Sequence, residues 1–298
     1  MSIGQAGAAL IIGEPRIALN HSEASIHNEA HAKKLGFRGS AVGGNVHLDL
    51  FVPPLLEAYG NAWFERGGLS VYFLNIVVSG EPVRAIVERP SAPGAQTRIE
   101  ARRADEEDFI VCAGTASIGD HSLSELSTRD LRLCDDSRLR LLKGVRPGHD
   151  LGTSEGRVTA RMQQALIDSG SMNEPLDWYL GESPWGGPIA SVTSTAGMMY
   201  RHLTGGEEEG YWRLSDAIGS ASGMFGAFEV VYVDGPVFLD RPYTVSGKVV
   251  GVGESPKTEY VWWDAETRDE SGRLVARMRH LLRYLKASSP LYPELQDA

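Results

Sequence analysis

The order of elements along this chain of 298 residues occurs twice, and this internal repeat limits most strongly what the chain can fold into. A glycine-rich segment, GFRGSAVGG (36–44), leads into an apolar stretch at 45–60, and WGGPIA (185–190) leads into a second apolar stretch that ends at 203. Strand-like runs follow both stretches. Two long units exclude solenoids and propellers, because those folds need several short units of fixed period.

The spacing of matching residues indicates an old duplication. Gly39 matches Gly187, 148 positions later, and Pro82 matches Pro242, 160 positions later. The second half therefore holds 12 extra residues between these points, where the polar segment TGGEEEGYWR (204–213) stands. We expect two halves of one architecture that differ by a loop insertion.

Each half is expected to hold one buried helix and four antiparallel strands, which makes the chain an α+β protein. Apolar residues crowd more than one face of 45–60, so this helix should be buried nearly all round, and Pro53 and Pro54 should kink it. Trp262 and Trp263 are adjacent in one strand and should face opposite sides. Runs rich in β-branched and aromatic residues predict strands at 69–80, 81–90, 96–108 and 109–119, and again at 228–237, 240–253, 258–270 and 272–286.

The segment between the halves lacks these patterns. Residues 120–160 are charged and poor in aromatic residues, and they end in a stretch that contains Pro147 and Gly148. We therefore expect a first domain over 1–119, a linker over 120–160 that crosses between the halves, and a second domain over 161–298.

Charge and cysteine content exclude several classes of function. The chain has 29 Lys and Arg against 39 Asp and Glu, a formal net charge of −10, which opposes a broad nucleic-acid or anionic-membrane surface. Its two cysteines cannot form a disulfide framework or a cysteine-rich metal site. No signal peptide and no spanning apolar segment is visible. We expect a cytoplasmic protein that binds neither nucleic acid nor a membrane.

The segment SIHNEAHAKKLGFRGSAVGG (25–44) resembles the hydratase segment of MaoC-like, (R)-specific enoyl-CoA hydratases and dehydratases. Their motif reads D-x-N-P-x-H, followed by G-F and by a small-residue run that ends in H-G. The matching positions here are Ile26-His27, Gly36-Phe37 and Ser40-Ala41-Val42-Gly43-Gly44. The resemblance implies a tandem (double) hotdog fold, in which each half is a curved antiparallel sheet wrapped around a central helix.

The motif is degenerate in both halves. Ser22 stands where the family has its catalytic Asp, and Ala24 and Ser25 replace the Asn and Pro. In the second half Asp177 falls at the His position, and Ser191-Val192 replaces the H-G pair. Neither half holds a complete Asp/His pair. We place the active site in the first half, where the motif is better preserved.

The residues around this motif predict the chemistry. His27 is expected to act as the acid and base, because an imidazole pKa of about 6.5 makes both protonation states usable, with Glu23 as its partner. Gly44 offers an unobstructed backbone N–H at a helix start, where a developing enolate oxygen would be held. The pair His27 and His31 lacks the HExxH pattern, so neither a metal nor a cofactor is expected. Substrate contacts are expected from Ser22, His31, Gly43, Asn45, His47 and Asp49.

Three functions follow from this reasoning. The resemblance implies a hydro-lyase that adds water to, or removes it from, an acyl thioester of CoA or acyl carrier protein, or a related unsaturated carbonyl compound. A hotdog thioesterase, with Asp49 or Glu23 directing water at the thioester carbonyl, is the first alternative. The second is a catalytically silent hotdog that binds an acyl or polyketide-like ligand or serves as a subunit, which Ser22 favours. A homodimer is left open.

Overall fold

The computed structural model describes residues 9–20, 22, 24–204, 218–219 and 221–295. These residues form one antiparallel sheet of 11 strands with short helices, so the fold is α+β as predicted. The strands are β1 (Leu10–Ile12), β2 (Arg16–Ile17), β3 (Gly67–Phe73), β4 (Pro82–Glu88), β5 (Thr97–Arg103), β6 (Ile110–Ile118), β7 (Asp150–Gly156), β8 (Gly223–Tyr232), β9 (Tyr243–Glu254), β10 (Thr258–Arg268) and β11 (Leu274–Leu285). The α-helices are α1 (Glu29–Lys34), α2 (Val52–Tyr59), α3 (Ala62–Arg66), α4 (Glu125–Thr128), α5 (Ala160–Asp168) and α6 (Val192–Thr204).

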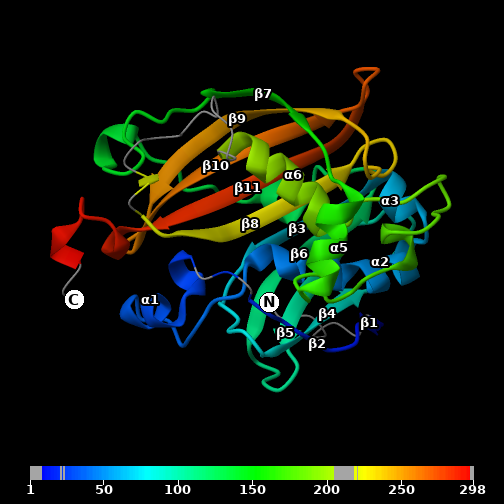
Figure 1. Cartoon of the computed structure of the whole chain (residues 1–298), viewed down its shortest axis with the longest axis horizontal. Coiled ribbons are helices and arrows are strands. Elements are labelled where there is room, and N and C mark those ends of the chain that lie inside the picture. Colours follow the sequence, from blue (N-terminus) through cyan, green and yellow to red (C-terminus); the bar gives the residue numbers. More distant parts are fainter. Residues whose placement is uncertain (1–8, 21, 23, 205–217, 220, 296–298) are drawn as a thin grey trace.

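The strand order is symmetric about the middle of the sheet. It reads β1-β4-β5-β6-β3 and then β8-β11-β10-β9-β7, with β2 paired to β4 at one edge. The two halves join through β3 and β8, whose antiparallel register runs from Gly68↔Val231 to Tyr72↔Ala227. Figure 1 shows the strands side by side, with α2, α3 and α6 lying along one face of the sheet. Each half therefore supplies five strands of this order, and the strands of the two halves follow one another in matching order from the centre of the sheet to its edge.

Repeated backbone contacts confirm the duplication. An isolated bridge joins Ala41 to Val78 in the first half, and another joins Ile189 to Phe238 in the second. These pairs are related by the same shifts of 148 and 160 positions that relate the matching glycines and prolines. Next to each bridge a further N–H···O bond repeats with the same shifts, at 2.9 and 2.7 Å: it joins Val42 to Val77 and Ala190 to Val237.

The central helix of the first half is interrupted. Three short pieces replace the predicted single helix over 45–60: the 3₁₀ turns η2 (Gly44–His47) and η3 (Asp49–Phe51), and then α2. Pro53 and Pro54 lack the N–H groups that would bond back to this turn, so the regular helix starts with them in its first turn. In the second half α6 runs without interruption for 13 residues.

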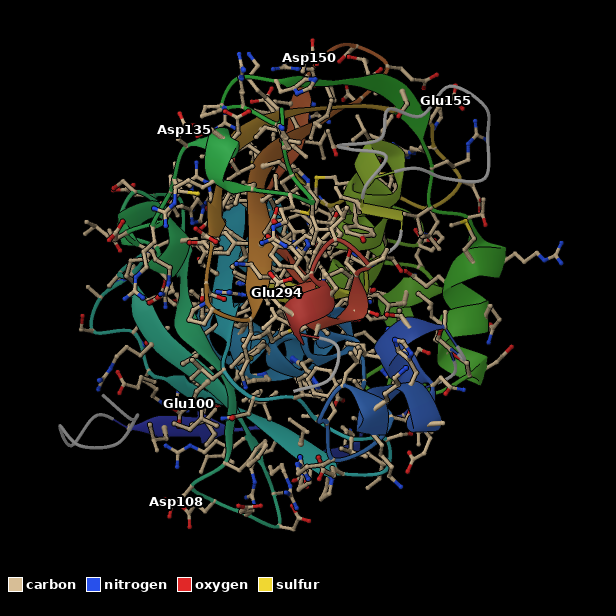
Figure 2. The ribbon with its side chains drawn as sticks, turned by 90° about the vertical axis from the view of Figure 1, so that its left-hand side faces the viewer. Glu100, Asp108, Asp135, Asp150, Glu155 and Glu294 are labelled. Carbon is tan, nitrogen blue, oxygen red and sulfur yellow. The ribbon has the colours of Figure 1, made fainter. Side chains whose placement is uncertain are left out.

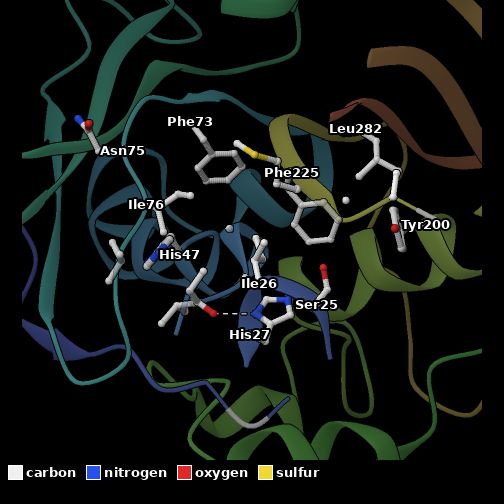
Figure 3. A pocket seen from close by; sticks show the side chains of 18 residues that line it. Ser25, Ile26, His27, His47, Phe73, Asn75, Ile76, Tyr200, Phe225 and Leu282 are labelled. Atoms are coloured by element: carbon white, nitrogen blue, oxygen red, sulfur yellow. Dashed lines mark hydrogen bonds between the residues drawn. The ribbon is translucent and has the colours of Figure 1, made fainter. Parts of the chain in front are cut away.

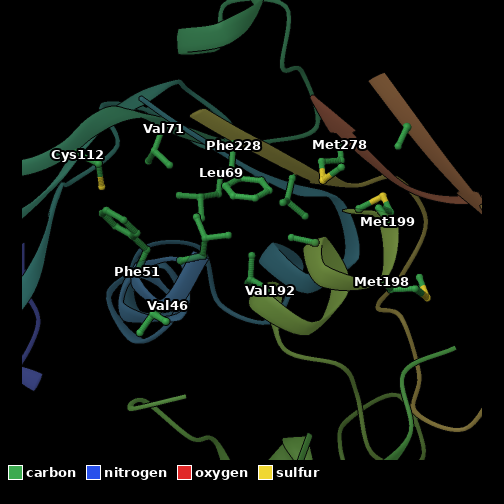
Figure 4. Packing of buried hydrophobic residues seen from close by; sticks show 14 of the residues in the cluster. Val46, Phe51, Leu69, Val71, Cys112, Val192, Met198, Met199, Phe228 and Met278 are labelled. Atoms are coloured by element: carbon green, nitrogen blue, oxygen red, sulfur yellow. The ribbon is translucent and has the colours of Figure 1, made fainter. Parts of the chain in front are cut away.

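The core lies between these helices and the sheet. Leu48, Phe51 and Leu55 on the first central helix are fully buried, as are Val192 and Met199 on α6. Figure 4 shows Val46, Phe51, Val192 and Met199 facing strand residues that include Leu69, Val71 and Phe228. The two helices thus share one continuous hydrophobic core, so that neither half is buried independently of the other.

The segment between the halves is docked rather than free. It contains α4, the 3₁₀ turn η4 (Asp136–Arg138) and strand β7, and β7 pairs with β9 at the edge of the second half's sheet. Backbone N–H groups of Arg140, Leu141 and Leu142 donate to the buried Glu259 carboxylate at 2.8–3.1 Å. The connection therefore packs onto the second half along much of its length.

Trp262 and Trp263 lie on opposite faces of the sheet, as predicted. Trp263 lies on the helix side, with its ring 6.1 Å from that of Tyr200 on α6. Trp262 lies on the outer side and packs with Leu126 of α4 and with Leu281. Among the described helices none has the length and apolar character needed to cross a membrane. Figure 2 shows Asp108, Asp135, Asp150 and Glu155, all exposed, at separate points around the edge of the molecule.

Candidate active site

A cavity of about 310 Å³ lies between the two halves and includes several of the predicted site residues. Figure 3 shows His27 and His47 on its first-half wall, opposite Tyr200 and Phe225 of the second half. The first half contributes Ser25, Ile26, His27, Ala41, Val42, Gly43, Gly44, His47, Phe73, Asn75, Ile76 and Val77. The second half contributes Tyr200, Ala221, Gly223, Met224, Phe225 and Leu282.

His27 is held firmly in the wall of this cavity. It ends the 3₁₀ turn η1 (Ser25–His27), where its N–H donates to the Ala24 carbonyl at 3.0 Å. Its own carbonyl accepts from the Asn20 amide at 2.8 Å and from the Ser40 hydroxyl at 2.7 Å. The backbone at His27 is therefore bonded on both sides, which limits movement of its ring.

The tautomer of His27 follows from its partner. Nδ1 lies 2.7 Å from the Ala41 carbonyl, and a carbonyl can only accept, so Nδ1 carries a hydrogen. In the neutral ring Nε2 is then the unprotonated nitrogen, and none of the described groups bonds it. His27 thus presents a free basic nitrogen beside the cavity, oriented by the same segment that contains the glycines.

Gly44 brings a free backbone N–H to the same cavity. It begins η2, and none of the described residues accepts a hydrogen bond from its N–H. The Phe73 ring packs directly on it: a Cβ added at position 44 would lie 2.8 Å from that ring. Glycine is therefore required here for the close approach of the ring that forms the neighbouring wall of the cavity.

His47 is a second imidazole at the cavity, on the same 3₁₀ turn as Gly44. Only 2% of its surface is exposed, and burial lowers its pKa to about 4, so the ring is neutral at pH 7. Its Nδ1 is buried without a hydrogen-bond partner among the described residues. A neutral imidazole in this place adds a weakly polar wall and no charge.

Asp49 does not line the cavity. It is fully buried and faces the start of α6, where the Thr193 N–H donates to its Oδ1 at 3.3 Å. Burial raises the pKa of this carboxyl to about 6, although bonds from Thr193 and Ser191 favour the charged form. The carboxylate predicted to contact substrate therefore serves the contact between the central helices.

Three further predicted contacts also lie away from the cavity lining. The Ser22 hydroxyl accepts from the Ala24 N–H at 3.2 Å, and His31 Nε2 lies 3.0 Å from the Ser222 hydroxyl of the second half. The Asn45 carbonyl accepts from the Thr193 hydroxyl at 2.6 Å. Gly43 does line the cavity. Glu23, the expected partner of His27, lies outside the described residues.

The second half has the same turn at the equivalent place, and it ends in a tyrosine. The 3₁₀ turn η5 (Asp177–Tyr179) corresponds to η1, because an equivalent backbone bond docks each turn against its glycine-rich segment. These bonds run from Ala41 to Ile26 and from Ile189 to Trp178, at 3.0 and 2.9 Å. Tyr179, rather than Asp177 as the sequence suggested, therefore occupies the place of His27.

Trp178, the neighbour of Tyr179 on η5, belongs to a cluster of packed aromatic rings. Phe64 lies at the centre, with the rings of Trp63, Trp178, Trp185 and Tyr232 at centroid distances of 5.1 to 6.3 Å. Trp63, Phe64, Tyr179 and Tyr232 are buried. None of these rings lines the cavity that holds His27.

The second-half wall of the cavity was missed by sequence reasoning. Gly223, Met224 and Phe225 belong to β8, which begins five residues before the predicted strand at 228. The repeat concealed them, because a shift of 160 positions relates them to 63–65, which form helix α3 in the first half. The one sequence signal that could have indicated these residues is their position directly before an expected strand.

The described residues offer no set of three His, Cys, Asp or Glu side chains arranged to hold a metal ion. The titratable side chains that line the cavity are His27, His47 and Tyr200, and no lysine, arginine or carboxylate is among its described lining residues. The site therefore suits an uncharged reacting group, with one imidazole for proton transfer and one backbone N–H for a developing negative charge.

Comparison with known proteins gave similarity in structure alone. No family model and no curated protein matches the chain. It is similar in structure to a protein from Mycobacterium tuberculosis described as having a double hotdog fold, with a TM-score of 0.59 and 12% identity over 93% of this chain and 96% of that one. It is also similar to a protein described as a MaoC domain dehydratase from Chloroflexus aurantiacus, with a TM-score of 0.58 and 9% identity over 93% and 95% of the two chains.

A third solved structure, titled as a MaoC-like dehydratase, has a TM-score of 0.50 and 12% identity over 94% of this chain and 98% of that one. At these identities the likeness shows the architecture. Together with the symmetric strand order and the paired central helices, it shows that this chain has a double hotdog fold, the fold of the MaoC-like dehydratases to which it is similar.

Proposed function

We propose that this protein is a hydro-lyase that adds water to a 2-enoyl thioester, or removes it from the 3-hydroxyacyl product, with His27 as acid and base. The observation that carries the proposal is that His27, with a free Nε2, and Gly44, with a free N–H, line one largely apolar cavity. Acyl thioesters of CoA or of acyl carrier protein fit a cavity whose walls are mostly aliphatic and aromatic. Both cysteines, Cys112 and Cys134, are free thiols, which fits the cytoplasmic location that we propose with it.

The residues divide the reaction as follows. His27 Nε2 takes a proton from water while the oxygen adds to C3 of the enoyl group. The negative charge that moves to the thioester oxygen is stabilised by the Gly44 N–H and by the helix start behind it. The imidazolium then gives its proton to C2, which completes the addition of one water molecule and restores neutral His27. Dehydration follows the same steps in reverse.

A test uses 2-enoyl thioesters of several chain lengths and follows loss of the conjugated double bond. We expect turnover by the wild-type protein and a large loss in His27→Gln, which keeps a polar side chain but has no basic nitrogen. An equal rate in His27→Gln would contradict the assignment. Release of free thiol without hydration would instead identify the thioesterase, although no described lining residue supplies its carboxylate. Ligand binding with neither reaction would identify the silent hotdog that Ser22 suggested.

A further inference from the structure

A second pocket, of about 160 Å³, lies on the outer face of the sheet, opposite the central helices α2 and α6. Trp262 lines it, whereas its neighbour Trp263 packs on the helix side, so the pocket and the cavity lie on different faces. Three arginines, Arg129, Arg132 and Arg283, line this outer pocket. Such a group of cations is unexpected in a chain of net charge −10, so it calls for a chemical reason.

Aromatic rings hold two of the three guanidinium groups, and acidic residues neutralise the three only in part. Arg283 donates to the Tyr72 hydroxyl and lies 5.1 Å from the centre of the Tyr260 ring. Arg129 stacks 3.7 Å above the Tyr72 ring and pairs with Glu125. Among the described residues no carboxylate forms an ion pair with Arg132 or Arg283. Two positive charges at this pocket therefore lack an acidic partner.

The remaining groups of the pocket also favour an anion. Trp262 has a buried indole N–H, a group that can only donate, with no acceptor among the described residues. Two acids line the pocket as well, Asp130 and Glu254. Glu254 is neutralised by ion pairs with Arg138 at 2.9 Å and with Lys286 at 2.8 Å. Asp130 forms no ion pair among the described residues and offsets one of the two unpartnered arginine charges. One positive charge and an excess of donors remain, which match a phosphate, a group that arginine recognises with paired N–H groups.

The outer pocket adjoins the cavity at a fork in the sheet. Strand β3 stays paired with β8 only as far as Tyr72↔Ala227, and from there Gly223–Phe225 pair with β11 alone. Met224 lines the cavity, and it stands directly opposite Arg283 on β11. Residues opposite each other in antiparallel strands share a face with Cβ atoms about 5 Å apart. Met224 therefore touches the cavity while sharing its strand face with an arginine of the outer pocket.

We propose that the outer pocket binds the phosphate of the arm that carries the acyl group, while the acyl end lies beside His27. The inference rests on the proposed function in that it takes the ligand to be a carried thioester. The two possible carriers of this thioester, CoA and acyl carrier protein, both possess a phosphorylated pantetheine arm. The arm passes through the fork between β3 and β8, with Met224 beside it.

Calorimetric titration tests the pocket without any turnover. CoA, 4′-phosphopantetheine and phosphate-free pantetheine are titrated into the wild-type chain and into Arg132→Gln and Arg283→Gln. We expect each substitution to raise the Kd of both phosphorylated ligands by about tenfold or more, and to leave the pantetheine Kd unchanged. The matched control is Arg277→Gln, which removes an exposed arginine of β11 that lies outside the pocket lining, and whose Kd values should equal those of the wild type.

Two ligand sources are separated by the same titrations. A 4′-phosphopantetheine Kd close to that of CoA indicates a site for the pantetheine phosphate, as presented by acyl carrier protein. A much weaker 4′-phosphopantetheine indicates that the nucleotide phosphates of CoA occupy the pocket. Arg283 packs on Tyr72, so if Arg283→Gln fails to fold, the exposed Arg132→Gln decides alone. Unchanged Kd values, equal losses for pantetheine, or no binding of phosphorylated ligands would overturn the proposal.

Kinetics then separate this inference from the proposed function. Phosphate-free thioesters of N-acetylcysteamine should keep their KM in the arginine variants, whereas the KM of the CoA thioester should rise and kcat should stay. Arginine-dependent binding without turnover of any thioester would refute the hydro-lyase and support the phosphate site. Turnover whose KM is independent of the arginines would refute the phosphate site and support the hydro-lyase.

Discussion

The two halves of this protein place the same backbone turn at the same point and use it in opposite ways. In the first half η1 ends in His27 beside an open cavity, whereas in the second η5 ends in Tyr179, buried beside packed aromatic rings. The backbone bonds that dock the two turns are nearly equal in length. The duplicated fold therefore preserves the geometry of a site, and the neighbouring side chains decide whether a ligand can occupy it.

The halves also depend on each other at their centre. Asp49 of the first half lies at the start of α6, and the Thr193 hydroxyl of α6 bonds the Asn45 carbonyl. In the opposite direction Tyr200 and Phe225 of the second half complete the cavity of the first. One half thus contributes the residues that we propose to be reactive, and the other contributes both packing and a wall of the cavity.

The sharpest test of this comparison substitutes each of the two matched residues, His27 and Tyr179, in turn. His27→Ala should lower kcat for the thioester reaction by about 10²–10⁴-fold, because it removes the group that moves the proton. Tyr179→Phe, at the same place in the other half, should leave kcat unchanged. Enoyl thioester assays measure both, and urea unfolding of each variant checks that the fold is intact. Equal losses in the two variants would show that the halves do not differ in the way proposed.

The packed aromatic cluster, to which both halves contribute, should respond in stability instead. Phe64→Ala should lower the free energy of unfolding by about 3–5 kcal/mol, because it empties the centre of the aromatic cluster. Phe225→Ala should cost less, because that ring already borders an open cavity, and it should shift substrate preference toward longer acyl chains. Urea denaturation and a chain-length series measure these effects. A larger loss in Phe225→Ala than in Phe64→Ala would reverse the assignment of open and filled sites.

Gly44 and its counterpart Val192 give a third contrast. Gly44→Ala places a methyl group 2.8 Å from the Phe73 ring, so the ring must move within the cavity wall. A displacement of this size should lower kcat/KM by about 10²-fold. Adding Phe73→Leu should restore part of the activity. Val192→Ala should change only stability, as followed by thermal unfolding. Full activity in Gly44→Ala would mean that the Phe73 wall and the N–H at position 44 are not used.

The smallest effect concerns the buried charge between the helices. Because burial raises the Asp49 pKa to about 6, the folded chain keeps a proton that the unfolded chain releases between about pH 4 and 6. Ionisation in this window lowers the free energy of unfolding as pH rises. Asp49→Asn should therefore raise the free energy of unfolding by about 2 kcal/mol at pH 7.5, as measured by urea denaturation. A less stable variant would show that the charge is needed at the start of α6.

The acid side of the same titration provides the control. Burial lowers the pKa of His47 to about 4 and that of His280 to about 3, so the unfolded chain takes up two protons below about pH 6.5 that the folded chain resists. Stability should fall with decreasing pH from about 6.5 to 4. Asp49 opposes this trend, so Asp49→Asn should steepen the fall. A slope that is unchanged by the substitution would contradict the raised pKa of Asp49.

Much of the fold followed from local pattern. The shifts between Gly39 and Gly187 and between Pro82 and Pro242 recur in the backbone bridges, because glycine and proline mark backbone conformations that a duplication conserves. The placement of Trp262 and Trp263 on opposite faces of the sheet followed from strand alternation. His27 and Gly44 were predicted as one site and line one cavity, while their catalytic roles remain the proposal.

Other residues could not be placed from the sequence. Asp49 stood beside the glycines and looked available to substrate, yet the turn of η3 directs it toward α6. The sequence motif pointed to Asp177, two residues before Tyr179, the true counterpart of His27. The correspondence is set by the backbone bond from Ile189 to Trp178 and not by the spacing of the motif. Met224 and Phe225 were missed because their counterparts by shift lie in a helix.

By itself the sequence determined the duplication, the central helical segment with the four strands that follow it in each half, and the glycine-rich turn at which a ligand could approach the backbone, since these depend on neighbours a few positions apart. It did not indicate the edge strands β1, β2 and β7. Only the tertiary structure decided which copy of the turn stays open, which carboxylate is withdrawn, and which strand end completes the wall. Those outcomes depend on contacts between residues that are 144 positions apart or more, so they cannot be read from local spacing.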